Sequence, residues 1–450
     1  MEIVRTWTCL RGLRSNVRCA PTSLRSLQDN LLRAAVVHAY VNIPFYRRLW
    51  DEAGLDVHAI RGIQDLDRIP VITGSMVREA AQRGELLAQG VDTSSCTYLD
   101  TSGSSGRSLR VWKQELEERV RRAVGLRIWL EHGFRWHWMT AQFQIKSGPS
   151  HVLQRIGVSR KTWISTERSL EEQLVGFLDA KADVVVGTAT ALRRIARAIE
   201  AHGARPKPPR ILFCAGELLD SETSGLVKRA LGADAIGLYG QTEVGYVAWQ
   251  CEQRAGFHVN ADTHFVEILS GGKPAREGEL GTIVVTDLRT RTMPFLRYDT
   301  GDLAVAAPGP CACGRTLPTL GSIEGRVRGS VSLEDGRILT TRVIIDHLGR
   351  RLPIGGYRLY QVSMHEFRLE LTSEGARVMG QQATILSHLR QILGEVKISI
   401  KNVDTWPADG TGKTHTVFSA VPIPDMAPDS VIGGTQTKSG DARLHGSVES

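Results

Sequence analysis

The chain has 450 residues, of which 42% are hydrophobic and 23% are charged, and its formal net charge is +8. This length exceeds what one compact core holds, so we expect at least two domains. No apolar run reaches the roughly 18 residues that a membrane helix needs, and the seven scattered cysteines follow no secretory signal, which together exclude membrane-spanning and disulfide-rich secreted classes and favour a cytoplasmic globular protein.

The N-terminal part of the chain is expected to be helical. The first 28 residues are rich in Arg and Ser, as in a transit peptide, but no apolar core or cleavage pattern follows them. We therefore favour an arm that lies on the surface. Residues 23–97 show apolar residues at helical spacing, and Pro44 divides this pattern into short helices joined by turns.

Helix and strand patterns alternate from about residue 98 to residue 300. "RSLEEQLVGFLDAK" indicates a helix and "ADVVVGT" a buried strand; "TALRRIARAIEAHG" and "RILFCAGE" repeat this order. Parallel strands need such crossover connections. The pattern therefore predicts an α/β fold with a largely parallel sheet.

The pattern changes after Gly256. Short strands such as "HFVEIL" and "GELGTIVVTDL" are separated by Gly, Asp and Pro, which favours a barrel-like or antiparallel subdomain over about 256–328, inside a large N-terminal domain of residues 1–328. Residues 329–421 predict a small α+β domain. Residues 422–450 contain few large apolar side chains and are expected to be disordered.

The positive net charge raises nucleic acid as a partner. In stretches such as "KQELEERVRRAVGLR", however, acidic and basic residues are mixed. Such mixing is more typical of a solvated helix face than of a phosphate-binding groove, so we do not favour nucleic-acid binding.

A loop at residues 101–106, "TSGSSG", combines hydroxyl side chains with two glycines. It is not the common nucleotide-triphosphate motif, which has four residues between its glycines and then a lysine. Glycine backbone and hydroxyl groups can still donate to an anion. Taken alone, the loop fits either a phosphate site or a solvent-exposed turn.

Four more stretches follow this loop in order: "FCAGE" at 213–217, "GLYGQTEVG" at 237–245, "RYDTGDLA" at 297–304 and "GTGKTHTV" at 410–417. The ordered set resembles the adenylate-forming superfamily. The segments "NIPFYRRLWDEAG", "DLDRIPVITGSMVRE", "HVNADTHFVEI" and "CACGRTLPTLGSIEGR" resemble its phenylacetate-CoA ligase branch. The resemblance covers about residues 24–420, apart from roughly 113–180.

This resemblance implies two-step chemistry that uses ATP and Mg²⁺. A carboxylate first forms an acyl-adenylate, and coenzyme A or an amine then takes the acyl group. The implied catalytic residues are Lys413, Thr242 and Glu243, with Glu243 as the magnesium ligand. The implied ATP-binding residues are Thr101, Ser102, Gly103, Ser104, Ser105, Gly106, Gly216, Glu217, Tyr239, Gly240, Asp302 and Arg326.

Each of these motifs also has a purely structural interpretation. "YGQTE" could be a strand followed by a capped helix, Asp302 could hold a turn, and Lys413 could lie on the surface. The chain also departs from the branch pattern: Arg107 replaces the usual lysine, and Val327–Gly329 replaces an aspartate pair where the domain hinge is expected. Arg328 would then be the pivot.

Four residues suggest a structural zinc site. Cys251, His258, Cys311 and Cys313 supply three thiols and an imidazole, the donors that closed tetrahedral zinc sites use. In some members of the phenylacetate-CoA ligase branch, which this chain resembles, a matching C-x-C-G-R segment accompanies a bound metal. The alternative is unconnected core thiols and a polar histidine.

The acid substrate and the acceptor are less well defined by the sequence. Trp136, His137, Trp138 and Phe143 could line a slot for a small aromatic or apolar acid, or they could pack a helix against the sheet. Coenzyme A is the favoured acceptor and an amine or amino acid the alternative. A homodimer is compatible with the chain, and the distant alternative is a non-catalytic, nucleic-acid-binding relative.

Overall fold

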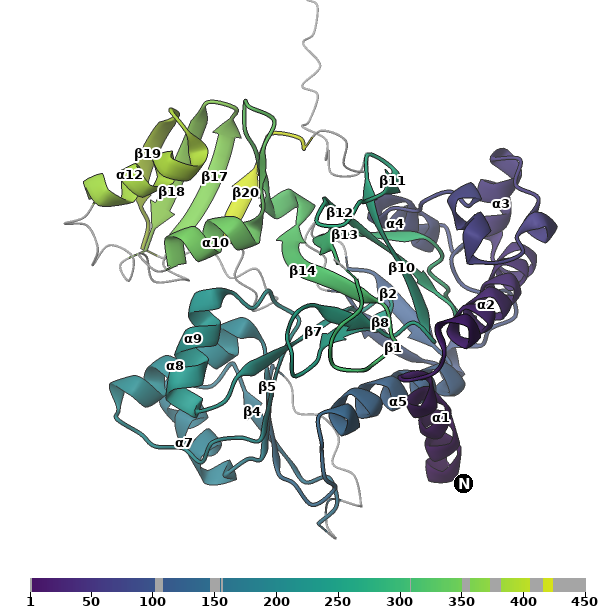
Figure 1. The fold of residues 1–450 in the computed structure, drawn as a ribbon, viewed down its shortest axis with the longest axis horizontal. Helices are drawn as coiled ribbons and strands as arrows, with labels where there is room; N and C mark the ends of the chain where they lie inside the picture. The colour runs from purple at the N-terminus through teal and green to yellow at the C-terminus, as the bar shows by residue number, and fades with distance from the viewer. Residues whose placement is uncertain are drawn as a thin grey trace, which may run out of the picture.

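The structure is a computed structural model that describes residues 2–101, 108–145, 154, 157–307, 309–349, 357–372, 382–404 and 416–423. Within these ranges, twelve strands form one continuous sheet across the molecule (Figure 1). Their order is β11-β10-β12-β13-β14-β9-β8-β7-β6-β5-β3-β4. The predicted α/β class is confirmed.

One half of this sheet is parallel. It consists of β3 (Thr140–Gln144), β4 (Lys161–Ser165), β5 (Val184–Gly187), β6 (Ile211–Ala215) and β7 (Ala235–Gln241). On one face, Val185, Leu212 and Cys214 are buried against helices α7 (Leu170–Ala180), α8 (Ala189–Ala201) and α9 (Ser221–Leu231). These helices have side-chain N-caps: Ser169 in a capping box with Glu172, Thr188, and Asp220.

The other half of the sheet is antiparallel. It consists of β8 (Gly245–Gln250), β9 (Phe257–Val259), β10 (His264–Ser270), β11 (Lys273–Pro274), β12 (Leu280–Asp287), β13 (Tyr298–Ala306) and β14 (Thr319–Arg326). The prediction that antiparallel strands follow Gly256 is therefore confirmed. The expected barrel-like form is not: over the described ranges these strands extend the same sheet and do not close on themselves.

The N-terminal residues lie on the surface, as expected, and form a helix that packs one face on the domain. Helix α1 (Glu2–Asn16) contacts α5 (Glu115–Glu131), because Leu10, Leu13 and Val17 are buried in the main core. The break at Pro44 is confirmed, since it separates α2 (Pro21–Asn42) from α3 (Pro44–Glu52). Short elements follow: η1 (Val57–Ala59), η2 (Ile63–Arg68), α4 (Gly74–Gln82), η3 (Thr93–Ser95) and the hairpin β1 (Thr97–Asp100)–β2 (Arg110–Lys113).

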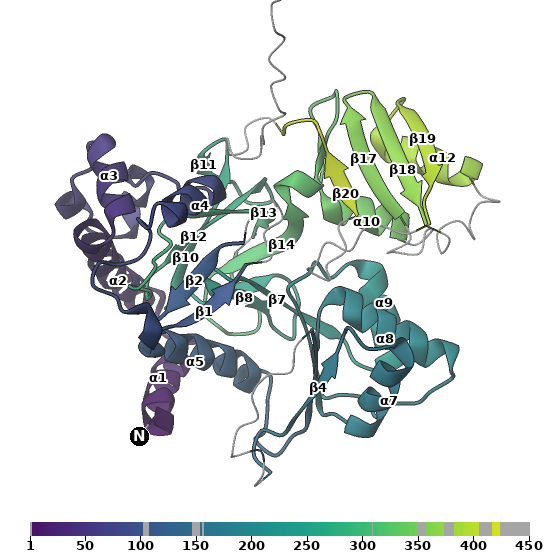
Figure 2. The same ribbon diagram turned by 180° about the vertical axis from the view of Figure 1, so that it is seen from behind.

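Residues 331–423, here called the C-terminal unit, have a sheet and a core of their own (Figure 2). A short turn, η4 (Val327–Gly329), precedes this unit. Its sheet has the order β19-β18-β17-β20. Its elements are β15 (Val331–Ser332), β16 (Ile338–Leu339), α10 (Thr341–Gly349), β17 (Tyr357–Ser363), β18 (Glu366–Leu371), α12 (Gln382–Leu393), β19 (Lys397–Asn402) and β20 (Val417–Ser419).

None of the helices in the described ranges combines the length and the apolar character that crossing a membrane requires.

Candidate active site and metal centre

The carboxyl ends of β6 and β7 lie side by side and carry several of the predicted site residues. Ala215 pairs with Leu238, so Gly216 and Tyr239 follow on neighbouring parallel strands. Gly216 has φ +81°, a conformation that favours glycine. The backbone N–H of Thr190 donates to Oε2 of Glu217 at 2.7 Å, whereas the buried Oε1 has no hydrogen-bond partner in the described chain.

The "YGQTE" segment is a strand and a tight turn into β8, so the alternative of a capped helix is wrong. A Cβ at Gly240 would overlap the carbonyl oxygen of Gly245, which explains why glycine is needed there. Thr242 and Glu243 lie in the turn and are partly exposed. The turn therefore presents both polar side chains at the end of the parallel strands.

Asp302, on β13, is the centre of a hydrogen-bond network. Its Oδ2 accepts from the Tyr239 hydroxyl at 3.0 Å and from Nε2 of Gln241 at 2.6 Å, and its Oδ1 lies 3.2 Å from Nε of Arg326. Gln241 also donates to the carbonyl of Thr300 at 3.0 Å. Asp302 is thus held by three side chains, and its place on a strand rules out the alternative that it serves a simple turn.

The electrostatics connect this network with Glu243. The Asp302 carboxylate raises the pKa of Arg326, and Glu243, Tyr239 and Tyr298 act in the same direction. Burial, followed by the charge of Asp302, holds the pKa of Tyr239 well above its usual value. Burial and the charge of Glu243 likewise raise the pKa of Tyr298. Glu243, Asp302 and Arg326 therefore belong to one charged cluster with two neutral phenols.

Two residues of this cluster were missed at the level of sequence. Gln241 lies inside the recognised motif but carried no assigned role. Lys113, at the end of β2, is 4% exposed, and its Nζ reaches the carbonyl oxygen of Glu243 at 3.5 Å. A lysine in "RVWK" just before a helix carries no pattern that marks it as buried, so no sequence signal could have identified it.

Thr101 is the one residue of the predicted phosphate-binding loop that the structure describes. Thr101 extends the pairing of the β1–β2 hairpin at its loop end: its N–H donates to the Leu109 carbonyl at 2.8 Å, and its hydroxyl accepts from the Leu109 N–H at 2.9 Å. Ser102, Gly103, Ser104, Ser105, Gly106 and Lys413 lie outside the described residues.

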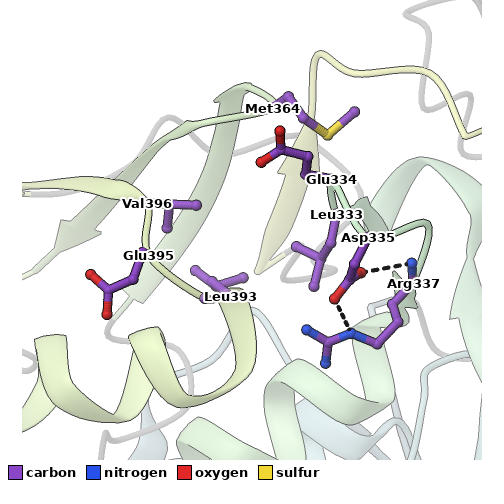
Figure 3. Close-up of a pocket in the computed structure, with 9 residues that line it drawn as sticks. Leu333, Glu334, Asp335, Arg337, Met364, Leu393, Glu395 and Val396 are labelled. Carbon is purple, nitrogen blue, oxygen red and sulfur yellow. Dashed lines mark hydrogen bonds and ion pairs between the residues drawn. The ribbon is translucent and has the colours of Figure 1, made fainter.

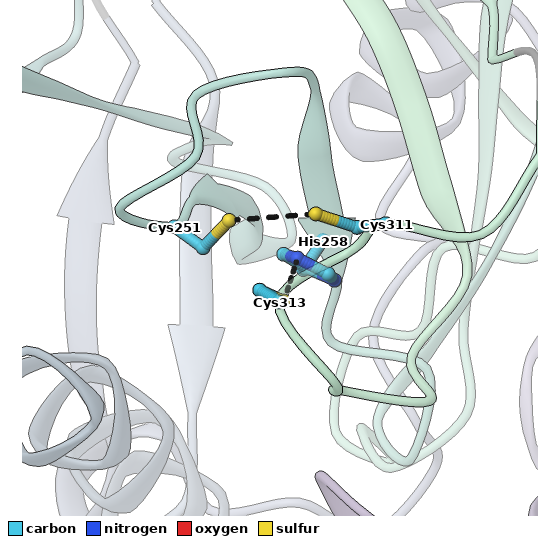
Figure 4. A group of neighbouring side chains, drawn as sticks. All are labelled: Cys251, His258, Cys311 and Cys313. Carbon is cyan, nitrogen blue, oxygen red and sulfur yellow. Dashed lines mark hydrogen bonds between the residues drawn. The ribbon is translucent and has the colours of Figure 1, made fainter.

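The four candidate zinc ligands meet in space, and their donor atoms all lie within 4.8 Å of one another (Figure 4). The Sγ atoms of Cys251 and Cys311 are 3.6 Å apart, and Sγ of Cys313 is 3.3 Å from Nε2 of His258. Zn–S bonds of about 2.3 Å in a tetrahedron place sulfur atoms about 3.7 Å apart. The donor set therefore fits a zinc ion in both chemistry and size.

The surroundings of this cluster act differently on its donor groups. Burial raises the pKa of Cys251 to about 11, which favours the thiol. Burial lowers the pKa of His258, which favours the neutral imidazole. Burial alone would raise the pKa of Cys313, but hydrogen bonds from the backbone and side chain of Arg315 outweigh it and favour the thiolate. Arg315 also bonds to Glu131 and Glu252 and lies over the Trp249 ring. The cluster is thereby tied to α5.

Phe143 and Trp136, two of the four residues expected near the acid, pack in different parts of the domain. Phe143 packs on Phe177 in the core beneath α7, whereas Trp136 packs on Trp7 and Phe134. These contacts favour the packing interpretation for Phe143 and Trp136.

A pocket of about 350 Å³ lies in the C-terminal unit (Figure 3). Leu333, Met364 and Leu393 line it together with Glu334, Asp335 and Glu395. Its lining contains none of the predicted site residues.

Comparisons with known proteins agree with this geometry. No family model matches the chain. The phenylacetate-coenzyme A ligase of Thermus thermophilus is 28% identical over 337 residues, covering 71% of this chain and 74% of that protein. The crystal structure of 2-hydroxyisobutyryl-CoA ligase, in the postadenylation state with 2-HIB-AMP, has 19% identity and a TM-score of 0.73, covering 90% of this chain and 91% of that one.

A more distant structure is the amide bond synthetase McbA from Marinactinospora thermotolerans. Its TM-score is 0.51 at 15% identity, and the overlap covers 72% of this chain and 69% of McbA. The resemblance inferred from the ordered motifs is thus confirmed: the chain is similar to phenylacetate-CoA ligases and has the fold of adenylate-forming ligases.

Proposed function

We propose that this chain is an ATP-dependent carboxylic acid ligase that forms an acyl-adenylate from a small aromatic or apolar acid and transfers the acyl group to coenzyme A. In the first step a carboxylate oxygen attacks the α-phosphorus of ATP, and the bond to pyrophosphate breaks. In the second step the thiolate of coenzyme A attacks the acyl carbon, and AMP leaves.

The observation that carries this proposal is the cluster of Tyr239, Gln241, Glu243, Asp302 and Arg326 at the carboxyl ends of the parallel strands. Ligands of open α/β sheets bind at this edge. The Asp302 carboxylate can accept hydrogen bonds from both ribose hydroxyls, and Tyr239 offers an aromatic face to adenine. The curated relative named above is a phenylacetate-coenzyme A ligase, which supports the same reaction class.

The other roles in the proposal follow the family resemblance. Glu243 would hold Mg²⁺, whose charge would offset that of the phosphates, and Thr242 would contact the α-phosphate. The loop from Thr101 to Gly106 would bind the β- and γ-phosphates, with Gly216, Glu217 and Gly240 beside the nucleotide. The C-terminal unit would act as a mobile lid that carries Lys413 and turns about Arg328.

Zinc is a separate part of the proposal. Cys251, His258, Cys311 and Cys313 would bind one zinc ion with no open position, which makes its role structural. Such an ion would join the strands β8 and β9 to the loop that precedes β14 and would stabilise the antiparallel half of the sheet.

An amine acceptor is the second candidate. The structural similarity to the amide bond synthetase supports it, because the same adenylation fold is found in a protein of that name. The first half-reaction is common to both candidates, so only the products can distinguish them.

Mass spectrometry of the products tests the proposal. Purified protein is incubated with ATP, Mg²⁺ and a panel of aryl and alkyl acids, with either coenzyme A or a mixture of amines. We expect AMP and an acyl-CoA from at least one acid. An acyl amide without acyl-CoA would support the second candidate, and AMP production with neither product would contradict the proposed acceptors.

A further inference from the structure

The C-terminal unit contacts the large sheet domain through α10, which lies close to α9 and to β14 (Figure 1). Arg342, in the first turn of α10, makes three of these contacts. Its Nε donates to the Ile323 carbonyl at 2.7 Å, its Nη1 donates to the Leu219 carbonyl at 3.2 Å, and the guanidinium pairs with Glu324 at 3.3 Å. One side chain thus bridges β14 and the loop before α9.

Asp346 lies one turn later on the same helix. Its Oδ1 accepts a hydrogen bond of 2.9 Å from the backbone N–H of Ser221, the first residue of α9. The first N–H groups of a helix have no acceptor within the helix, and their partial positive charge attracts a carboxylate. The N-cap Asp220 already binds the N–H of Thr223, so Asp346 supplies a second acceptor from another part of the chain.

These contacts fall on a segment next to the proposed nucleotide site. Leu219 and Ser221 follow Gly216 and Glu217, whose side chain is itself fixed by the N–H of Thr190. Residues 216–221 therefore include both the residues that border the proposed nucleotide site and the residues that contact α10. A change in the position of the C-terminal unit acts directly on this segment.

The contact between α10 and residues 219–221 also has features of an interface whose two sides can separate. Three buried polar atoms near it have no hydrogen-bond partner among the described residues: Tyr357 Oη, Glu222 Oε2 and Arg193 Nη1. Burial and then the charge of Asp220 raise the pKa of Tyr357, on which Arg193, Glu222 and Asp346 also act. Buried polar groups without partners cost free energy, and separation would return them to water.

We propose that Arg342 and Asp346 are positioning residues that dock the C-terminal unit on residues 219–221 for adenylation and release it before acyl transfer. This inference rests on the proposed two-step function. The hydrogen bond from Ser221 to Asp346 exists only while the unit is docked. Its loss therefore slows the first half-reaction and leaves the second unchanged or faster.

The test compares wild type with Asp346→Ala, with Asp346→Asn, which keeps an acceptor oxygen, and with Asp335→Ala as a control acid in the same unit. Adenylation is measured as ATP–pyrophosphate exchange and acyl transfer with supplied acyl-adenylate and coenzyme A. Docking is measured as hydrogen exchange of the Ser221 amide. We expect Asp346→Ala to slow adenylation about fivefold to tenfold, to leave transfer undiminished and to speed Ser221 exchange. Asp346→Asn should restore most of the adenylation rate and most of the protection of the Ser221 amide from hydrogen exchange.

Other outcomes would overturn the inference. Equal losses in the two half-reactions would indicate general damage to the unit, and unchanged Ser221 exchange in Asp346→Ala would show that the contact does not form. Failure of the proposed function would look different. The wild-type protein would then show no ATP–pyrophosphate exchange with any acid. Docking is still measured in that case by the difference in Ser221 exchange between wild type and Asp346→Ala.

Discussion

The hydroxyl of Tyr239 donates a hydrogen bond of 3.0 Å to Oδ2 of Asp302, and Gln241 donates to the same oxygen at 2.6 Å. The carboxylate is therefore held in one orientation before any ligand binds. Preorganised acceptors of this kind lower the cost of binding, since little reorganisation is left to occur.

We expect Asp302→Ala to weaken nucleotide use strongly. Hydrogen bonds to a charged group contribute about 1.5–3 kcal/mol each, so loss of the carboxylate should lower kcat/KM for ATP by about tenfold to a hundredfold or more. Steady-state kinetics with varied ATP provide the measurement. The control is Asp179→Asn at an exposed position of α7, which should behave as wild type. Full activity of Asp302→Ala would refute the assigned role.

Lys113→Met should lower both activity and stability. Methionine is close to lysine in length and keeps the packing of the stem, but it cannot donate to the Glu243 carbonyl. We expect adenylation to fall about tenfold, because the turn that carries Glu243 is less well fixed. The free energy of unfolding should also fall, because the charge of Lys113 lowers the pKa of the buried Asp287, and this carboxylate would lose its partner. Urea unfolding and pyrophosphate exchange measure the two effects. Lower stability with unchanged pyrophosphate exchange would indicate a purely structural lysine.

Zinc content tests the metal proposal. Protein purified without chelators should contain about one zinc per chain by elemental analysis. Cys313→Ser should lose most of the metal and lower the Tm by several degrees, because the thiolate next to Arg315 is removed. Cys96→Ser, at a cysteine outside the cluster, should retain both metal and stability. Wild-type protein without zinc would contradict the proposal.

Glu131 predicts a defined pH dependence of stability. Burial alone would raise its pKa, but Arg18 and Arg315 outweigh burial and lower it. A carboxyl group with a lowered pKa stabilises the fold above its unfolded pKa, near 4.3, and this contribution is lost as the pH falls through the folded pKa. Glu131→Gln should therefore cost about 2 kcal/mol at pH 7.5 and much less near pH 3.

Urea unfolding of wild type and Glu131→Gln at the two pH values measures this difference. The exposed Glu167→Gln serves as the control and should have little effect at either pH. A cost for Glu131→Gln that is the same at pH 7.5 and pH 3 would show that the ion pairs with Arg18 and Arg315 contribute nothing.

The local patterns of the sequence were sufficient to predict most of the elements. Apolar strands such as "VVVG" and "ILFCA" are buried on both faces, and Ser169 and Thr188 cap the helices that follow. The packing of α1 was not predictable, because its partners in α5 lie about 100 residues away. The same holds for the continuous sheet, since "GELGTIVVTDL" forms antiparallel pairs whether or not a barrel closes.

In the candidate site, too, the motifs could be predicted from the sequence, whereas contacts between distant parts of the chain could not. The motifs that contain Tyr239, Glu243 and Asp302 were recognised because their order along the chain is preserved. Lys113 was missed because burial of a lysine depends on the hairpin that β1 and β2 form against the β7–β8 turn. The contact between Asp346 and Ser221 joins residues 125 positions apart and has no sequence pattern.

The most direct test of the central claim is acid-dependent ATP–pyrophosphate exchange by the wild-type protein, without any acceptor, across a panel that includes phenylacetate and other aryl and alkyl acids. We predict exchange that requires Mg²⁺ and is specific for one or a few acids. Folded protein that binds ATP and yet shows no exchange with any acid of the panel would contradict the assignment of this chain as an adenylate-forming ligase.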